Sequence, residues 1–357
     1  MINAYNDLKN IIRSYLLKEK LDKIASNTKD LYNLSLSLNV PCVIGYTLKN
    51  NNQYDPIFDK SIYKSLNRYT SFQKCRDTIS VLFSNEKIKY IFLKGATIAK
   101  YYVEPYLRYS SDVDLIIHKD DYDRALSLLT DKLSFVIKKH LPNEMTLLSP
   151  EGVSIDFHRT FEYEKEEFEK IFENCFDNNE LDINYKYVHL LEHQAKHFVR
   201  GILELRFFID LFYLRDKINK EKVGQLLDKI ELRDFDLKLN SYLDYILLLH
   251  EPTDIDLKIE QYILSYAKDQ GASNRVNNSQ NKAFYFINHA FPSYKIMKGV
   301  YPILEKYPVL LPWYYIVRIV KMLKSDRRHY VADEFKGSIS DSKSSLINEL
   351  GISSYNK

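Results

Sequence analysis

Glycine is scarce in this chain. The 357 residues include only 9 glycines, and no two of them lie within ten residues of each other. Motifs that need paired glycines are therefore absent: the dinucleotide-binding fingerprint, the Walker phosphate loop, the kinase glycine-rich loop and the Gly-x-Ser-x-Gly elbow. Scarce glycine beside abundant leucine, lysine and glutamate favours a largely helical chain.

Cysteine, long apolar runs and excess charge are also lacking. The 3 cysteines, Cys42, Cys75 and Cys175, are too few and too scattered for a disulfide framework or a zinc cage. The most apolar stretch, residues 307–323, contains Pro312 and two basic residues, so it falls short of the ~20 apolar residues of a membrane span. No secretory leader is visible, and the expected location is the cytoplasm. The net charge of +3 gives no indication of a nucleic-acid partner.

Hydrophobic spacing divides the chain into regions. Residues 1–85 and 161–335 have the three- and four-residue spacing of helices, and residues 336–357 form a polar tail. In residues 86–160, by contrast, short β-branched and aromatic runs are separated by turn residues. The expected strands are 89–94, 112–117, 135–137, 145–148 and 153–158, with helices at 96–103 and 121–133. The sequence thus predicts an α+β fold: a small α/β core with a mixed sheet, N-terminal helices and a larger C-terminal helical domain.

Three aspartates of the core form the candidate catalytic site. Asp112 and Asp114 lie at positions i and i+2 of a predicted strand, so both carboxylates share one face of it, and Val113 points to the core. Asp156 lies in a later strand and reaches the same place if the two strands are neighbours. Clustered carboxylates repel one another unless a cation neutralises them, and three of them with open coordination positions suit Mg²⁺. Mn²⁺ is the alternative ion.

The turn at residues 94–96 is a candidate phosphate site. Gly95 lets the backbone approach a ligand closely, and the helix that follows offers free N–H groups. Lys94 or Arg108 adds positive charge against a triphosphate. An isolated Asp-x-Asp pair is a weak pattern, usually a solvated strand end. The order is more specific: a strand, a glycine and a helix, then Asp112 and Asp114, then Asp156 in a strand of its own.

These residues resemble the nucleotidyltransferase superfamily typified by DNA polymerase β, and more narrowly the bacterial group labelled uncharacterised nucleotidyltransferases. The resemblance is carried by residues 93–96, 106–114 and 155–158, and it extends through 191–214 to 291–313. In the superfamily the turn usually contains Gly-Ser or Gly-Gly. Here it is Gly95-Ala96, so a hydroxyl contact to phosphate is missing.

The resemblance implies a Mg²⁺-dependent enzyme that moves a nucleoside monophosphate from an NTP to an acceptor hydroxyl and releases pyrophosphate. It implies catalytic and metal-binding roles for Asp112, Asp114 and Asp156. The implied nucleotide-binding residues are Lys94, Gly95, Ala96, Arg108 and Ser111. The acceptor stays open among a small molecule, a protein and RNA.

The candidates for the acceptor side are His158, His193, His197, Arg206 and Asp210. His193 and His197 share a helix face, but the metalloprotease motif lacks its glutamate, and packing against the core is the favoured interpretation. Arg206 and Asp210 have the i,i+4 spacing of an ion pair. The candidates between residues 187 and 214 line one site only if that stretch breaks, and Gly201 is the expected break.

Two other functions stay open. A glycosyltransferase of the Asp-x-Asp type would place a nucleotide-binding α/β half before the motif, where helices are predicted here. A non-catalytic helical protein that binds a nucleotide or a partner through a degenerate core is the other, although all three carboxylates are present. The aromatic and basic stretch 313–328 is interpreted as a helix with solvated cations rather than a nucleic-acid or membrane surface.

Overall fold

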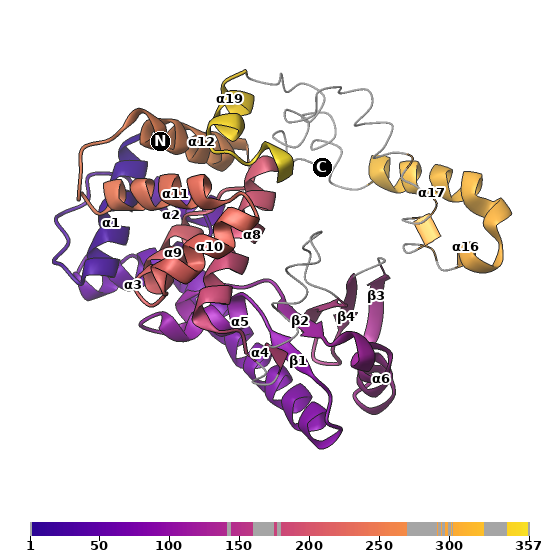
Figure 1. Ribbon diagram of the computed structural model, residues 1–357. Helices are drawn as coiled ribbons and strands as arrows, with labels where there is room; N and C mark the ends of the chain where they lie inside the picture. The colour runs from indigo at the N-terminus through magenta and orange to yellow at the C-terminus, as the bar shows by residue number, and fades with distance from the viewer. Residues whose placement is uncertain are drawn as a thin grey trace.

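A computed structural model describes residues 2–140, 144–159, 175–176, 180–269, 291, 294, 297–298, 301, 303–324 and 341–355. A five-stranded mixed sheet lies beside a body of helices that come from both ends of the chain (Figure 1). The predicted α+β fold is confirmed. Among the described residues no helix has the length and apolarity to cross a bilayer.

The sheet has the order β1-β2-β5-β4-β3. Its strands overlap the five predicted segments: β1 (Tyr90–Phe92), β2 (Val113–Ile117), β3 (Val136–His140), β4 (Glu144–Leu148) and β5 (Ser154–His158). Strands β2 and β5 are parallel, and the other neighbouring pairs are antiparallel. The two strands that carry the candidate aspartates are therefore direct neighbours.

One face of the sheet is apolar. Side chains alternate along a strand, so Val113, Leu115 and Phe157 point to this face and are buried. They share a hydrophobic cluster with the C-terminal half of α4 (Asp59–Asn85) and with α6 (Tyr122–Ser127). Strand β2 thus has a fixed orientation, and its other face is left for polar residues.

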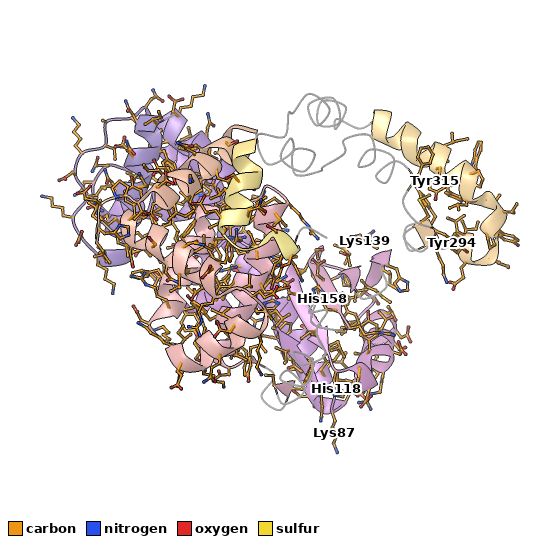
Figure 2. The ribbon with its side chains drawn as sticks, turned by 45° about the horizontal axis from the view of Figure 1, so that its top comes forward. Lys87, His118, Lys139, His158, Tyr294 and Tyr315 are labelled. Atoms are coloured by element: carbon orange, nitrogen blue, oxygen red, sulfur yellow. The ribbon has the colours of Figure 1, made fainter. Side chains whose placement is uncertain are left out.

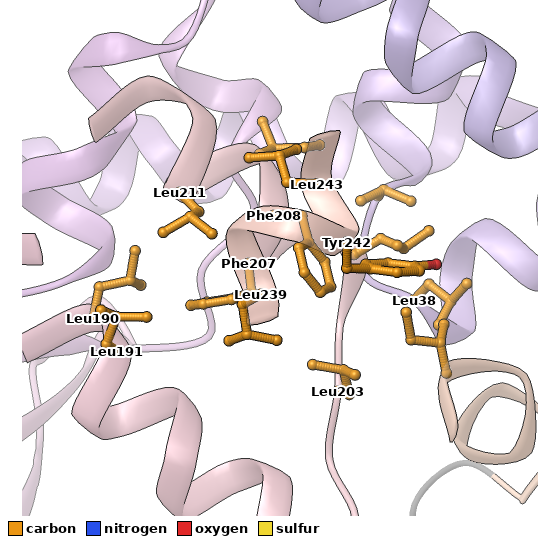
Figure 3. Close-up of a cluster of buried hydrophobic side chains, with 14 of the residues drawn as sticks. Leu38, Leu190, Leu191, Leu203, Phe207, Phe208, Leu211, Leu239, Tyr242 and Leu243 are labelled. Carbon is orange, nitrogen blue, oxygen red and sulfur yellow. The ribbon is translucent and has the colours of Figure 1, made fainter. Parts of the chain in front are cut away.

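The helices from the two ends of the chain share one hydrophobic core. The N-terminal ones are α1 (Ile2–Leu17), α2 (Thr28–Ser37) and α3 (Pro41–Asn50). The C-terminal ones are α8 (Ile183–Val199), α9 (Leu205–Arg215), α10 (Lys220–Lys229), α11 (Arg233–Ile246) and α12 (Asp254–Asp269). Figure 3 shows Leu38, the residue after α2, beside Tyr242 of α11. The Tyr5 and Tyr242 hydroxyls are hydrogen-bonded at 2.5 Å, so the two groups form one helical body.

The predicted break in the 187–214 stretch is confirmed. Helix α8 ends at Val199 and α9 begins at Leu205. Gly201, between them, has a φ of 80°, a left-handed conformation that costs glycine little and other residues more. The break lets residues on both helices face the same side of the sheet.

Two segments differ from the prediction. The helix expected at 96–103 consists of two short turns, α5 (Gly95–Ile98) and the 3₁₀ turn η2 (Ala99–Tyr101). Residues 341–349, expected within a polar tail, form α19 (Asp341–Glu349). Leu346, Leu350 and Ile352 are buried in the large core. The many serines in this segment make it look polar in the sequence, so its helical apolar spacing was not recognised.

The C-terminal aromatic and basic stretch is described only in part. Helix α16 (Ile303–Lys306) precedes it, α17 (Leu311–Lys324) contains its residues 313–324, and Trp313 is exposed. Residues 325–328 lie outside the described residues. The interpretation of this stretch stays a prediction.

Candidate active site

The polar face of the sheet carries the candidate aspartates. In the register of β2 and β5, Asp114 lies directly opposite Asp156, and Ile116 lies opposite His158. Parallel neighbours in register point to the same face, so Asp114, Asp156 and His158 share it. Asp112 precedes β2 by one residue and is partly buried, whereas Asp114 is only 6% exposed. Figure 2 shows His158 where the sheet meets the helical body.

Lys94 points its ammonium at this face. Its Nζ lies 2.9 Å from Oδ1 of Asp114, and both side chains are largely buried. The residue has a φ of 44°, which L-residues rarely adopt. Its carbonyl accepts hydrogen bonds from the amide and hydroxyl of Thr97. Backbone strain of this kind persists where the surroundings impose it and is common at functional sites.

The two aspartates of the Asp-x-Asp pair have opposite pKa shifts. Burial alone would raise the pKa of Asp114, but Lys94 and His158, whose Nε2 is 3.5 Å from Asp114 Oδ1, hold it well below its ordinary value. Burial and the neighbouring Asp114 charge raise the pKa of Asp112. Titratable groups whose environments separate their pKa values mark candidate functional sites.

The three carboxylates provide the oxygen donors that Mg²⁺ prefers. Their present contacts are with the protein: Ser111 donates to Asp112 at 2.9 Å, Lys94 pairs with Asp114, and Thr146 donates to Asp156 at 3.3 Å. Within the described residues, no three His, Cys, Asp or Glu side chains are grouped closely enough to hold a metal ion. The carboxylate oxygens are suitable ligands for Mg²⁺, but the side chains are not grouped around a common point. The three-carboxylate metal site therefore stays a prediction.

Arg108 has a contact that the sequence does not indicate. Its Nε and Nη2 donate to the two oxygens of Asp210 at 2.8 and 2.6 Å, and its Nη1 donates to Ser110 at 2.9 Å. The hydroxyl of Tyr102 donates to the same carboxylate at 2.7 Å. These contacts make Arg108 a positioning residue, and its predicted contact with phosphate stays a prediction. Arg108 joins the loop before Asp112 to α9.

The predicted ion pair between Arg206 and Asp210 is wrong. Arg206 pairs instead with Glu204, with the Nη2–Oε2 distance at 2.8 Å, and it donates to the backbone carbonyl of Tyr109. The i,i+4 spacing is present on α9, but the doubly hydrogen-bonded Arg108 takes up the Asp210 carboxylate. Arg206 thus holds the same loop as Arg108, at a second point.

Gly95 is required by space. A Cβ on Gly95 would lie 2.2 Å from Ser110 Oγ and 2.8 Å from Arg108 Nη1. The absent side chain therefore makes room for Ser110 and Arg108 of the loop that leads to Asp112. The predicted contact of this turn with phosphate stays a prediction. Ser111, on that loop, is exposed and hydrogen-bonded to Asp112. The side chain of Ala96 lies outside the described residues.

The histidines of α8 lie beside Lys94. The rings of His193 and His197 are in contact, with centroids 4.1 Å apart. Burial, helped by the charge of Lys94, lowers the pKa of His193 well below its ordinary value. Burial likewise lowers the pKa of His197 to about 4. Both imidazoles are therefore neutral at pH 7.

Helix α4 contributes residues that the sequence analysis missed. Ser65 donates to the carbonyl of Tyr106 at 2.5 Å, and Arg68 donates to the carbonyl of Ser111 at 2.6 Å and to the hydroxyl of Tyr109 at 3.1 Å. The available signal was the helical spacing of polar side chains on the inward face of α4. The loop before Asp112 is thus held by α4 on one side and α9 on the other.

A comparison with protein families agrees with this geometry. The family model described as uncharacterised nucleotidyltransferase matches residues 54–247, more than half of the chain. The chain belongs to this nucleotidyltransferase family. The match includes α4, the sheet, the broken α8–α9 pair and every candidate site residue. No curated protein and no solved structure matches the chain.

Membership of this nucleotidyltransferase family supports a transferase enzyme and implies an NTP substrate. Nucleotidyltransferases generally use divalent metals. The loop contacts of α4 and α9 lie within the family match, so the match covers the residues that position Asp112 as well as the aspartates themselves.

Proposed function

We propose that this nucleotidyltransferase transfers a nucleoside monophosphate from an NTP to an acceptor hydroxyl, with Mg²⁺ as cofactor and pyrophosphate as the second product. The observation that supports the proposal is the β2–β5 register, in which Asp114 lies opposite Asp156. Asp112 lies one residue before β2. Residues 2–89, all described, contain helices and no strand, which disfavours the glycosyltransferase alternative.

Each side chain has a role that follows from its position. Asp112, Asp114 and Asp156 are the groups that would hold the metal, which lowers the pKa of a bound hydroxyl and neutralises phosphate charge. Lys94 neutralises Asp114 and stands at the edge of the same face. The chemistry needs little more than positioning and charge compensation, and the doubly anchored loop before Asp112 supplies the positioning.

The acceptor side of the proposal rests on α8. His193 and His197 are neutral at pH 7, since burial lowers both of their pKa values. A neutral imidazole near the metal-binding face can accept a hydrogen bond from the attacking hydroxyl and orient it. His158 contacts Asp114 and is interpreted as a residue that orients that carboxylate.

Isothermal titration of each common NTP with Mg²⁺ tests the proposal, followed by assay of pyrophosphate release with cell extract as the acceptor source. We expect saturable binding of at least one NTP by the wild-type protein. The Asp112→Ala and Asp114→Asn variants should weaken binding of the metal–nucleotide by at least about tenfold, because each removes a metal ligand. Release of pyrophosphate should fall to the background level in both variants.

Asp120→Asn is the matched control. Asp120 lies just after β2, and its carboxylate is well exposed, so its loss should leave nucleotide binding unchanged. Wild-type protein that binds no NTP, or Asp112→Ala and Asp114→Asn variants that bind as tightly as the control, would contradict the proposal.

A further inference from the structure

The ion pair between Lys94 and Asp114 involves one of the proposed metal ligands. Lys94 Nζ lies 2.9 Å from Asp114 Oδ1, and the two side chains are only 16% and 8% exposed. His158 Nε2 lies 3.5 Å from the same oxygen. A divalent ion and an ammonium at one carboxylate repel each other. Lys94 and a metal ion would therefore compete for Asp114.

Backbone hydrogen bonds place Lys94 beside Asp114. The amide of Leu93, the residue after β1, donates to the carbonyl of Asp114 at 3.0 Å. Lys94 comes next, and its carbonyl accepts hydrogen bonds from the amides of Thr97 and Ile98 at 2.9 and 3.0 Å. The backbone on both sides of Lys94 is therefore fixed, and its side chain alone can change partners.

The backbone conformation of Lys94 favours glycine. Its φ of 44° and ψ of −118° lie in a region that glycine adopts readily and other residues rarely. Strain of this kind persists where the surrounding structure imposes it, and it is common at functional sites. Glycine would avoid the strain, so the presence of lysine at this position is explained by what its ammonium does.

Loss of the Asp114 contact would be unfavourable for Lys94 unless another anion replaced it. A largely buried cation that has lost its carboxylate costs free energy. Asp112 is itself a proposed metal ligand and so offers no alternative partner. The phosphate oxygens of an NTP do, because they accept strong hydrogen bonds from an ammonium. Lysine suits an exchange of partners, since its compact charge lies at the end of a flexible four-carbon stem.

We propose that Lys94 makes metal binding depend on the nucleotide, a role that rests on the proposed function. The Lys94 ammonium competes with a divalent metal for Asp114, and once displaced it pairs with the polyphosphate of the NTP. Metal without nucleotide therefore binds weakly, and metal together with a triphosphate binds strongly. Lys94 is in this sense a specificity-determining residue, which admits the metal as a complex with the substrate.

Titration of Mn²⁺ into the full-length protein without nucleotide tests the competition. We expect Lys94→Gln and Lys94→Met to bind Mn²⁺ at least about tenfold more tightly than the wild type, because the competing charge is gone. Lys94→Gln keeps a hydrogen-bond donor for Asp114, which favours a folded variant. Asp114→Asn should remove the tighter binding when it is combined with Lys94→Gln, if the ion lies at this carboxylate. Lys89→Gln, which changes an exposed lysine just before β1, is the matched control and should bind Mn²⁺ like the wild type.

Titration of the Mn²⁺ complexes of ATP, GTP, CTP and UTP should give the opposite sign. Any complex that the wild type binds should bind roughly tenfold more weakly to the Lys94 variants, since the ammonium no longer reaches phosphate. Loss of a purely structural contact would instead weaken both kinds of binding, and loss of a phosphate contact alone would leave the affinity for free Mn²⁺ unchanged. Thermal melts give an independent readout, because Mn²⁺ should raise the melting temperature of the variants more than that of the wild type.

The inference is overturned if the Lys94 variants bind free Mn²⁺ no more tightly than the wild type does. The proposed function would survive that result if the wild type still bound a Mn²⁺–NTP complex. A wild type that binds no Mn²⁺–NTP complex would contradict the proposed function. Tighter binding of free Mn²⁺ by the variants would even then support the competition between Lys94 and the metal.

Discussion

The two faces of the central sheet are built from alternate residues of the same strands, and they differ in what they contribute. On the apolar face, Leu115 and Phe157 are fully buried against α4 and α6. On the polar face, Asp114, Asp156 and His158 lie beside the helical body. Buried charges cost free energy unless they are compensated. The apolar face therefore accounts for the stability of the core, and the charged groups of the polar face are those to which we assign the proposed transfer reaction.

Neighbouring positions of β5 allow the largest test of this contrast. Phe157→Ala should lower the free energy of unfolding by about 3–5 kcal/mol, because it empties a packed site. NTP binding by the folded fraction should persist. Asp156→Asn should change stability by only about 1 kcal/mol, yet reduce nucleotidyl transfer by roughly 10³-fold, as expected for loss of a metal ligand. Urea denaturation and an assay of pyrophosphate release measure both effects.

The contrast would be broken if Asp156→Asn unfolded the protein as severely as Phe157→Ala. Asp156 would then be a structural residue of the sheet. Retention of full transfer by Asp156→Asn would remove Asp156 from the proposed metal ligands, whatever its effect on stability.

Variants of the Arg108–Asp210 pair test whether this buried ion pair contributes to stability, to transfer activity or to both. Both side chains are almost fully buried, at 5% and 2% exposure. Asp210→Leu alone should cost about 3–5 kcal/mol, because it leaves the guanidinium buried without a partner. Arg108→Met combined with Asp210→Leu should recover most of that stability. Transfer activity should stay low in the double variant, since the loop before Asp112 has lost an anchor.

Thermal melts and kcat/KM values for the two single variants and the double variant form the cycle that checks this. A double variant with full activity would show that the pair holds the fold and has no part in positioning Asp112. An unchanged stability of Asp210→Leu would show that the contacts from Arg68 and Arg206 suffice to hold the loop.

Much of the sheet could be predicted from the sequence, because its signals are local. Apolar alternation at Val113 and Leu115 and the turn residues between runs identify the strands within a few residues. The shared face of Asp112 and Asp114 follows from the same alternation. The sequence does not determine whether β2 and β5 are neighbours in the sheet. The structure shows that they pair directly.

The contacts between distant segments could not be predicted in the same way. Arg108 and Asp210 are 102 residues apart, and the i,i+4 spacing on α9 favoured the wrong partner, Arg206. Arg68 of α4 was visible only as a polar residue on a helix. Its role depends on which face of α4 meets the loop at 105–111, and that is set by the packing of Ile79 and Phe83 on the sheet.

The smallest expected effect is a pH dependence on the polar side. The pKa of His197 is lowered by burial to about 4, from an ordinary value of 6.5. The unfolded chain therefore binds a proton that the folded chain refuses, and the free energy of unfolding should fall as the pH drops from about 6.5 toward 4. In His197→Asn this decline should be shallower than in the wild type. NMR titration of the ring protons gives the direct measurement. A His197 that titrates near pH 6.5 would place its ring in solvent and away from Lys94. Helix α8 would then contribute no buried histidine to the polar side of the sheet.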